Sequence, residues 1–457
     1  MVTKPKPPST GVRKIAARNF LNTAFKEFSL YDNVRSIPKL TDGLKPSQRK
    51  AIYGAQTRGE NASLLSVERL SAHCAASTDY HHGVGSMQST IIGLANKYAG
   101  SNNMNLFEPE GQFGSRLTAD AAAARYIETK LTPYFRMLFP KADDCILEYN
   151  QTDGEKIEPV TYLPLLPITL VNGAQGTGTG HACLVMAYNP KEIATACLTV
   201  VQGKKLTDGT LAPWYKGFKG AIERNPINGQ VIITGKMEVV NTTTIKISEL
   251  PIGVYLDQYK DHLNKLEDEE FIKDYEDRST EDGFDFTVTV PRTTTALPIE
   301  ELYKKFKLVS RDTENFTLWG IDGILRRMQS AEEVVTEFVA WRSSMFEIRR
   351  QKLIEVAKLD IAWASERIRF INFYLKNTAL FKNTGKKELI ELLISNKFTE
   401  YERLLAMSIW NLTKDKIAEL EKELAGLKDY LATLEKDTAD KMYVRELKAL
   451  INNLTEF

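Results

Sequence analysis

Two adjacent side chains, Arg125 and Tyr126, are the first candidates for chemistry in this sequence. A phenol has a pKa of about 10 in water and is a poor nucleophile at neutral pH. A neighbouring guanidinium favours the phenolate and also binds phosphate oxygens through its planar fork of N–H donors. The alanines at 121–124 would let another backbone approach closely. The pair is therefore a candidate nucleophile for a phosphate, although most Arg-Tyr pairs in proteins are structural.

A second candidate is the pair His81 and His82, within the sequence DYHHG at 79–83. Histidine can donate to a phosphate or transfer a proton near neutral pH. His73 and Cys74 precede the pair. Their spacing matches no standard zinc pattern, so a metal site is disfavoured. Contacts within a turn between helices are the alternative interpretation.

Four cations form a third candidate, Arg35, Lys45, Arg49 and Lys50. On a helix, Lys45 and Arg49 are four residues apart and share one face. Such a one-sided pair fits phosphate binding. A solvated helix face is the alternative.

The glycine-rich stretch at 173–180, with the sequence GAQGTGTG, has the composition of a nucleotide loop. It lacks the GK[ST] ending of a phosphate-binding loop, and it lacks the GxGxxG spacing followed by a βαβ unit. We interpret it as a tight backbone turn, which argues against a nucleotide-binding enzyme.

The composition is that of a soluble globular protein, with 43% hydrophobic and 26% charged residues. No apolar run is long enough to span a bilayer, and the N-terminus lacks the apolar stretch of a signal peptide. The four cysteines are scattered without a CxxC pair. This pattern favours reduced thiols in a cytoplasm-like compartment.

The net charge of +1 hides an asymmetry along the chain. Up to residue 137 there are 18 Lys and Arg against 10 Asp and Glu, and the remainder carries 42 against 49. A basic front part suggests a localised site for a polyanion, although uneven charge also occurs in other large soluble chains.

The elements that must position these residues follow from periodicity and turn signals. Residues 1–12 are rich in Pro and Lys and are predicted to be disordered. From 13 to about 140 the pattern is helical, with Pro46 in a first turn. Helices predicted at 64–77 and 86–98 flank the histidine pair, in the outline of a helix-turn-helix. From about 155 to 325, β-rich runs at 231–234, 244–247 and 284–290 predict a separate α+β domain.

From about 330 to 455 the sequence predicts helices almost throughout. A long helix is expected from about Ala331 to Ile371, and Thr413 is a plausible N-cap of a later one. Apolar residues then recur at spacings of three and four, at Ile417, Leu420, Leu424, Leu427, Leu431 and Leu434. This heptad seam favours an antiparallel coiled-coil arm, with an ordinary helical bundle as the alternative.

Taken together, short motifs in a fixed order resemble the breakage-reunion subunit of a type IIA DNA topoisomerase. The N-terminal motifs are RSIP at 35–38, DGLKP at 42–46, QRK at 48–50, YHHG at 80–83, GSNN at 100–103, GQFGSR at 111–116 and ARY at 124–126. The later ones are YLP at 162–164, NGA at 172–174, GTG at 178–180, SELP at 248–251 and MSIWNLT at 407–413. The order of the motifs holds over nearly the whole chain. The motif sequences resemble eukaryotic and phage-type enzymes more closely than they resemble the bacterial gyrase A subunit.

The resemblance implies an α+β multidomain fold. Residues 13–155 would form a winged-helix DNA cleavage domain, 156–328 an α/β tower domain, and 329–457 a long antiparallel coiled coil with a C-terminal dimer gate. The implied activity is that of an ATP-dependent type II topoisomerase, which passes one duplex through a transient double-strand break in another.

The resemblance also implies roles for individual residues. Tyr126 would attack a phosphodiester to form a 5′-phosphotyrosyl link, and Arg125 would stabilise the transition state. Arg35 and His82 match family positions at the scissile phosphate. The expected DNA-binding residues are Lys45, Arg49, Lys50, His81 and Thr177.

The Mg²⁺-binding Toprim motif and the ATPase motifs of the family are not found in this sequence; the acidic run at 267–270 lacks the following glycine. We therefore expect Mg²⁺ and ATP to be bound by a separate ATPase/Toprim subunit, in a heterotetramer of a phage-type or bacterial split enzyme. This chain would form the central homodimer on double-stranded DNA. It would act in the cytoplasm, which is the host cytoplasm if the protein comes from a phage.

Two departures from the family pattern affect these expectations. Relatives usually carry isoleucine where Thr177 stands, and that side chain wedges between bases to bend the duplex. Threonine is smaller and polar, so it should intercalate less well. Relatives also carry an acidic residue where Val84 stands, so drug sensitivity does not transfer to this chain.

A non-enzymatic DNA-binding dimer with the same winged helix is the alternative function. Trapping of covalent protein–DNA adducts separates it from the enzyme.

Overall fold

The computed structural model describes residues 15–59, 61–225 and 227–457. The tail predicted at 1–12 lies outside the described residues. Contacts divide the chain into two compact units. Unit 1 comprises the chain up to Pro140, Leu147–Val339 and Leu450–Phe457, and unit 2 comprises Lys141–Ile146 and Ala340–Ala449. The predicted boundary at 155/156 falls within unit 1, so a division between cleavage and tower domains stays a prediction.

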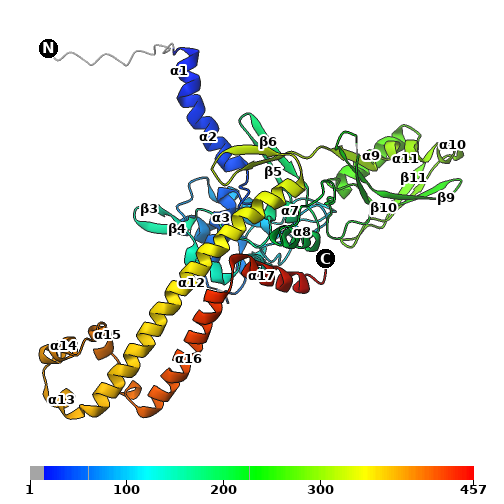
Figure 1. Ribbon diagram of the computed structural model, residues 1–457. Helices are drawn as coiled ribbons and strands as arrows, with labels where there is room; N and C mark the ends of the chain where they lie inside the picture. The colour runs from blue at the N-terminus through cyan, green and yellow to red at the C-terminus, as the bar shows by residue number, and fades with distance from the viewer. Residues whose placement is uncertain (1–14, 60, 226) are drawn as a thin grey trace, which may run out of the picture. The chain divides into compact units, whose positions relative to one another are not determined.

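The first part of unit 1 is mainly helical, as predicted (Figure 1). Its elements are α1 (Ala17–Asn22), α2 (Ala24–Ser36), α3 (Pro46–Thr57), β1 (Leu65–Ser66), α4 (Val67–Ser77), α5 (Val84–Ala95), β2 (Glu128–Thr129) and α6 (Pro133–Leu138). Helix α3 begins with Pro46, and the Lys45 N–H donates to Oε1 of Gln48 at 2.8 Å. Helix α4 is capped by Ser66, whose side chain accepts from the N–H of Arg69. These caps satisfy N–H groups that helix starts leave without partners.

Helices α3 and α4 pack closely because α3 carries a glycine at the contact. A methyl group added at Gly54 would lie 2.6 Å from Cα of Cys74. Ile52, Leu70 and Ile91 are fully buried in the same region, one from each of α3, α4 and α5. All four cysteines are free thiols.

The rest of unit 1 mixes strands and helices. The elements up to the centre of this part are β3 (Tyr149–Thr152), β4 (Glu155–Pro159), α7 (Ile168–Val171), β5 (Ala174–Gly178), β6 (His181–Val185), α8 (Pro190–Val201), β7 (Ala221–Arg224), β8 (Val231–Thr234) and β9 (Lys236–Asn241). They are followed by β10 (Thr244–Glu249), α9 (Leu256–Asp268), β11 (Asp274–Asp277), β12 (Phe286–Thr289), α10 (Arg292–Thr295), α11 (Ile299–Lys305), β13 (Val309–Asp312), β14 (Phe316–Trp319) and β15 (Leu325–Met328). The β-rich runs predicted near 231, 244 and 286 are confirmed as β8, β10 and β12.

The largest sheet is antiparallel, with strand order β11-β12-β10-β9. Ile245 pairs with Val288 and Ile247 with Phe286, and all four side chains are buried. Alternate residues therefore point into one core, as the period of two requires. The inner face of α9 joins this core through Leu263 and other apolar residues. In Figure 1 the sheet and α9 to α11 form one group of green elements.

Helix α12 (Ala331–Lys376) starts in unit 1 and continues through unit 2. Near its start, Glu332 accepts a hydrogen bond from the N–H of Leu211, which explains why its first turns belong to unit 1. The remaining elements are η1 (Lys141–Ile146), α13 (Thr378–Asn383), α14 (Lys386–Ser395), α15 (Tyr401–Leu405), η2 (Ile409–Asn411), α16 (Lys414–Lys436) and α17 (Ala439–Asn453).

Helices α12 and α16 run antiparallel within unit 2 (Figure 1). Arg367 pairs with Glu423 at 2.9 Å, and Lys358 pairs with Glu435 at 3.5 Å, so the order of partners reverses. Thr413 caps α16, as predicted, and accepts from the N–H of Lys416. Of the predicted seam, Leu420 and Leu434 are buried, and Ile417, Leu424, Leu427 and Leu431 are half-buried. Short helices and an apolar cluster around Phe370 and Phe398 connect the two long helices.

Unit 2 also holds a buried ion cluster, which we call the arginine cluster: Asp143, Arg342, Arg349 and Glu446. Nη2 of Arg342 lies 2.5 Å from Oδ2 of Asp143, and Nη1 of Arg349 lies 3.2 Å from Oδ1. The other Arg349 amino group pairs with Glu446. Both arginine side chains are at most 1% exposed. Each guanidinium lies over the ring of Phe346, at 4.2 and 4.3 Å from its centroid.

Within the described part of the chain, none of the helices combines the length and apolarity needed to span a membrane.

Candidate functional site

Tyr126 lies on a short segment that hydrogen-bonds to the start of α4. The Ala124 carbonyl accepts from the N–H of Glu68 at 3.0 Å, and the Ile127 carbonyl accepts from Val67 at 3.0 Å. The Tyr126 N–H donates to the carbonyl of Ala123 at 2.8 Å. Because the alanines have only methyl side chains, this backbone can lie directly against the helix. The Tyr126 side chain is 72% exposed and therefore open to a large substrate.

Arg125 lies over the ring of its neighbour. Its guanidinium carbon is 5.1 Å from the centroid of Tyr126, a cation–π distance. No ion pair or side-chain hydrogen bond of Arg125 occurs among the described residues. Its five N–H donors are thus available for an anion next to the phenol.

Arg35 stands in the last turn of α2 and is exposed. It, too, has no ion pair within residues 15–59, 61–225 and 227–457. Its position depends on how α2 is seated on the hairpin of β5 and β6. Asn33 donates to the Thr179 carbonyl at 3.0 Å, and Thr179 donates to Asp32 at 2.7 Å.

Two glycines of the stretch 173–180 make this seat possible. A methyl group added at Gly176 would lie 2.0 Å from the carbonyl oxygen of Ser36. One added at Gly178 would lie 2.3 Å from Oδ1 of Asn33. The glycines therefore allow a helix to approach a strand, and the stretch forms a β-hairpin rather than a phosphate-binding loop. Thr177, between them, is exposed and pairs with Ala182.

His82 is held by two tyrosines. Its Nε2 lies 2.9 Å from the hydroxyl of Tyr31 on α2, and the ring of Tyr80 meets it edge-on at 5.4 Å. Desolvation lowers the pKa of His82, and electrostatic interactions with Arg35, His81 and Lys50 lower it further. The ring is therefore neutral at pH 7, with one nitrogen donating and the other accepting. The neighbouring His81 points its Nε2 at Oδ1 of Asp79, 3.1 Å away.

The prediction that Arg49 binds DNA is wrong. Its side chain is 4% exposed and makes two bonds to Asp42, Nε to Oδ2 at 2.6 Å and Nη2 to Oδ1 at 2.9 Å. It also donates to the Leu44 carbonyl at 2.7 Å. Arg49 thus neutralises a buried carboxylate and fixes the turn before α3. The helical spacing was right, but this face of α3 turns inward.

The two lysines of the same motif are also engaged within the protein. Lys50 pairs with Glu158 at 2.8 Å and donates to the Thr78 carbonyl at 2.5 Å. Lys45 donates to the Gln175 carbonyl in β5 at 2.8 Å, and burial lowers its pKa. Lys45 therefore helps to tie α3 to the hairpin. A direct role of either lysine in phosphate binding stays a prediction.

The structure thus brings the predicted residues into two groups. Arg35 and Lys50 both lower the pKa of His82, and Arg125 contacts Tyr126. No hydrogen bond, ion pair or ring contact joins the two groups among the described residues. Sequence reasoning missed Tyr31. Its signal was present, because it precedes Arg35 by four residues on a predicted helix and so shares its face.

Metal binding finds no support in these side chains. In the three described stretches, no group of three or more His, Cys, Asp or Glu is arranged to hold a metal ion. The residues therefore do not fit the Mg²⁺ that the family resemblance implies, and no chemical step below involves a metal on this chain.

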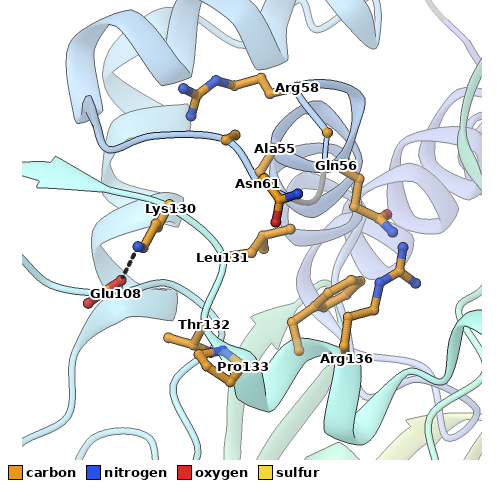
Figure 2. Close-up of a pocket in the computed structure, with 13 residues that line it drawn as sticks. Ala55, Gln56, Arg58, Asn61, Glu108, Lys130, Leu131, Thr132, Pro133 and Arg136 are labelled. Carbon is orange, nitrogen blue, oxygen red and sulfur yellow. Dashed lines mark ion pairs between the residues drawn. The ribbon is translucent and has the colours of Figure 1, made fainter.

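A cavity of about 550 Å³ is lined by other side chains (Figure 2). It is bordered by the end of α3 and by residues 130–136, with Lys130 and Glu108 paired at 3.4 Å. None of the predicted site residues lines it.

Comparisons with known proteins confirm the family resemblance of the sequence motifs. A family model that describes the A subunits of DNA gyrase and topoisomerase IV matches residues 35–450. The chain is 33% identical to DNA topoisomerase 2 of Arabidopsis thaliana, covering 96% of this chain and 33% of that protein. It is 31% identical to DNA topoisomerase 2-beta of Gallus gallus, covering 97% and 30%. The chain spans about a third of the length of these curated relatives.

The structural comparison covers the same extent. The crystal structure of the Plasmodium falciparum topoisomerase II DNA-binding, cleavage and re-ligation domain superposes with a TM-score of 0.89 at 34% identity. The match covers 96% of this chain and 64% of that one.

Proposed function

The chain belongs to the family formed by the A subunits of DNA gyrase and topoisomerase IV, and we propose that it cleaves and religates DNA within a type II topoisomerase. The observation that carries the proposal is the exposed Tyr126, with the guanidinium of Arg125 beside it, which has no ion-pair partner among the described residues. An exposed phenol next to an available cation is what attack on a phosphodiester requires.

In the proposed step, the Tyr126 hydroxyl gives up its proton and its oxygen attacks a backbone phosphorus. A bond forms between Oη and phosphorus, and the bond from phosphorus to the 3′ oxygen breaks. The 3′ oxygen takes up a proton and leaves as a hydroxyl. Because the phosphotyrosyl link keeps the energy of the phosphodiester, attack by the 3′ hydroxyl reverses the step and reseals the strand.

Negative charge increases on the non-bridging oxygens in the transition state. Arg125 and Arg35 can both donate to these oxygens, because neither is committed to an ion pair in the described structure. The neutral ring of His82 adds one further donor. In this proposal, His81 and the exposed Thr177 on the hairpin contact the flanking DNA, and the lysines Lys45 and Lys50 add positive charge behind them.

The fold is consistent with the family's domain plan. We assign residues 13–155 to a winged-helix cleavage domain, 156–328 to a tower domain, and 329–457 to an antiparallel coiled coil with a dimer gate. Two copies of the chain would then cut the two strands of one duplex, and a second duplex would pass through the break.

Mg²⁺ and ATP would be bound by residues outside the 457 of this sequence. We propose a separate ATPase/Toprim polypeptide, two copies of which join the homodimer in a heterotetramer. The single-chain relatives represent the other arrangement. Purification of the chain from its source, followed by identification of the polypeptides bound to it, decides between the two.

Covalent capture tests the proposed chemistry. The complete enzyme, incubated with supercoiled DNA, Mg²⁺ and ATP and then denatured, should yield a protein–DNA adduct at Tyr126. Tyr126→Phe should reduce the adduct at least about a thousandfold, because phenylalanine has no nucleophilic oxygen. Tyr430→Phe, an equally conservative change at another exposed tyrosine, is the control. Normal cleavage by the Tyr126→Phe enzyme would refute the proposal, and DNA binding without any adduct would favour a non-enzymatic binding dimer.

A further inference from the structure

Tyr31 is a contact of His82 that the sequence motifs did not include. It lies on α2, is 53% exposed, and places its hydroxyl 2.9 Å from Nε2 of His82. A tyrosine hydroxyl both donates and accepts, and a neutral imidazole offers one nitrogen of each kind. The bond therefore has two forms, which differ in the ring nitrogen that carries the proton.

The two forms present different atoms to a substrate. If Tyr31 donates to Nε2, the ring proton of His82 sits on Nδ1, and Nδ1 can donate to an oxygen. If Nε2 donates to Tyr31, Nδ1 carries a lone pair instead. The hydrogen bond made by one ring nitrogen in this way decides the state of the other.

The charges around His82 favour the first form when a phosphate is bound. Arg35, Lys50 and His81 lie close enough to influence the charge of the ring, so the surroundings suit an anion. A phosphate oxygen next to Nδ1 would be repelled by a lone pair and attracted by an N–H. Tyr80 contacts His82 through its ring edge and donates its own hydroxyl to Ser86 at 3.0 Å. Tyr31 is therefore the tyrosine whose hydroxyl is directed at the imidazole.

Helix α2 gives Tyr31 a fixed position. Tyr31 and Arg35 are four residues apart and lie on one face of the helix. The helix is seated on the β5–β6 hairpin through Gly176 and Gly178, with Asn33 bonded to the Thr179 carbonyl. One rigid helix thus carries both the phosphate-binding cation and the hydroxyl that meets His82.

We propose that Tyr31 is a positioning residue, whose hydroxyl donates to Nε2 of His82 and keeps the ring proton on Nδ1 for donation to a phosphate oxygen. The inference rests on the proposed DNA cleavage and adds a residue to it. Tyr31 acts through His82 and does not itself touch the reacting phosphate.

The test is a double-mutant cycle in the complete enzyme, read as the single-turnover rate of DNA cleavage. Tyr31→Phe keeps the ring and removes the hydroxyl, so the fold is preserved. It should slow cleavage about three- to tenfold, the usual value of one hydrogen bond. In a His82→Ala background the same change should have no further effect, because the residue through which it acts is gone. Tyr53→Phe on α3 is the matched control and should cleave normally.

A pH series separates positioning from a general structural effect. A donated hydrogen bond favours the neutral ring, so its loss should raise the pKa of His82. The midpoint on the acid side of the cleavage profile should therefore move to higher pH in Tyr31→Phe. That transition should be absent from His82→Ala and unchanged in Tyr53→Phe.

Several outcomes would overturn the inference. Tyr31→Phe with a normal rate and pH profile would exclude a role for the hydroxyl. Additive losses in the double mutant would mean that Tyr31 contacts DNA directly. If the wild-type enzyme forms no adduct at Tyr126, the proposed function fails as well, whereas a normal adduct with an unaffected Tyr31→Phe enzyme overturns only the role of Tyr31.

Discussion

Arginine serves two different purposes in the two units of this chain. In unit 1, Arg35 and Arg125 are exposed, and neither has a carboxylate partner among the described residues. In unit 2, Arg342 and Arg349 of the arginine cluster are buried and share Asp143. The same side chain is therefore available to a ligand in one region and committed to ion pairs within the fold in the other.

The energetic reasons for the two arrangements differ. Burying a guanidinium removes it from water, which costs several kcal/mol unless a carboxylate and further contacts replace the lost solvation. The arginine cluster provides these contacts through Asp143, Glu446 and the ring of Phe346. An exposed guanidinium keeps its hydration and can exchange it for a phosphate at little cost.

Pairing, rather than residue type, therefore distinguishes a binding cation from a structural one. Arg49 illustrates the point, because it belongs to the same motif region as Lys45 but is buried against Asp42. In its burial and its pairing with a carboxylate, Arg49 is more similar to the arginines of unit 2 than it is to Arg35. This comparison predicts losses of stability in one region and losses of activity in the other.

The largest effect on stability is expected from Asp143→Ala. The substitution removes the carboxylate that both buried guanidinium groups share, and breaking a buried pair in this way costs about 3–5 kcal/mol. Hydrogen–deuterium exchange should show faster exchange in α12 near 342–349 and in α17, with α3 unchanged. Unchanged protection in α12 would show that Asp143 does not hold the cluster together.

A surface ion pair in the same unit provides the control for Asp143→Ala. Glu355 pairs with Lys352 at 2.8 Å, and both side chains are exposed. Like Asp143→Ala, Glu355→Ala removes one carboxylate from unit 2, but this carboxylate lies on the surface of α12. Since exposed pairs contribute little, its exchange pattern should match that of the wild type.

A smaller effect, and one on activity alone, is expected from Arg35→Ala. Removing one donor to a developing oxyanion costs about a hundredfold in rate, or about 2.7 kcal/mol. The slope of the logarithm of the DNA affinity against the logarithm of the salt concentration should also become shallower by about one, because one fewer phosphate is neutralised. Cleavage rates and binding isotherms at several salt concentrations measure both quantities, and the thermal midpoint should not change.

Arg292→Ala removes the same charge from the exposed start of α10 and is the matched control for Arg35→Ala. It should leave the rate and the salt dependence as they are. Equal losses in the two variants would mean that net charge, and not the position of Arg35, determines binding.

Local features of the fold could be predicted because they depend on neighbouring residues. Pro46 begins α3 and Thr413 caps α16, as the sequence indicated. The alternation around Ile245 placed β10 correctly, because a strand with one buried face must repeat every two residues. The exposed Tyr126 was selected through its motif rather than through any local rule.

Burial of single charges could not be predicted, because it depends on residues far away in the sequence. Arg342 meets a carboxylate 199 positions earlier, and the stretch that supplies Asp143 gives no signal of this. Arg35 and Arg49 both stand in short motifs of the same N-terminal region. Only the packing of α3 reveals that Arg49 faces the core. The packing of α2 against the β5–β6 hairpin could not be predicted for the same reason, because a glycine-rich stretch is usually interpreted as a turn and not as a site of close helix packing.

The smallest of the three effects is expected from Gly176→Ala, which tests whether the seat of α2 serves the exposed arginine. The added methyl group would meet the Ser36 carbonyl at 2.0 Å, and because that atom belongs to the backbone, α2 or β5 must shift. Such overpacking costs about 1–3 kcal/mol. Arg35 immediately precedes Ser36, so cleavage should slow as well, by less than in Arg35→Ala. Gly93→Ala on α5, where the methyl group meets no atom within 4 Å, is the control and should preserve both stability and cleavage. A Gly176→Ala enzyme that is less stable but cleaves normally would mean that Arg35 does not depend on this seat.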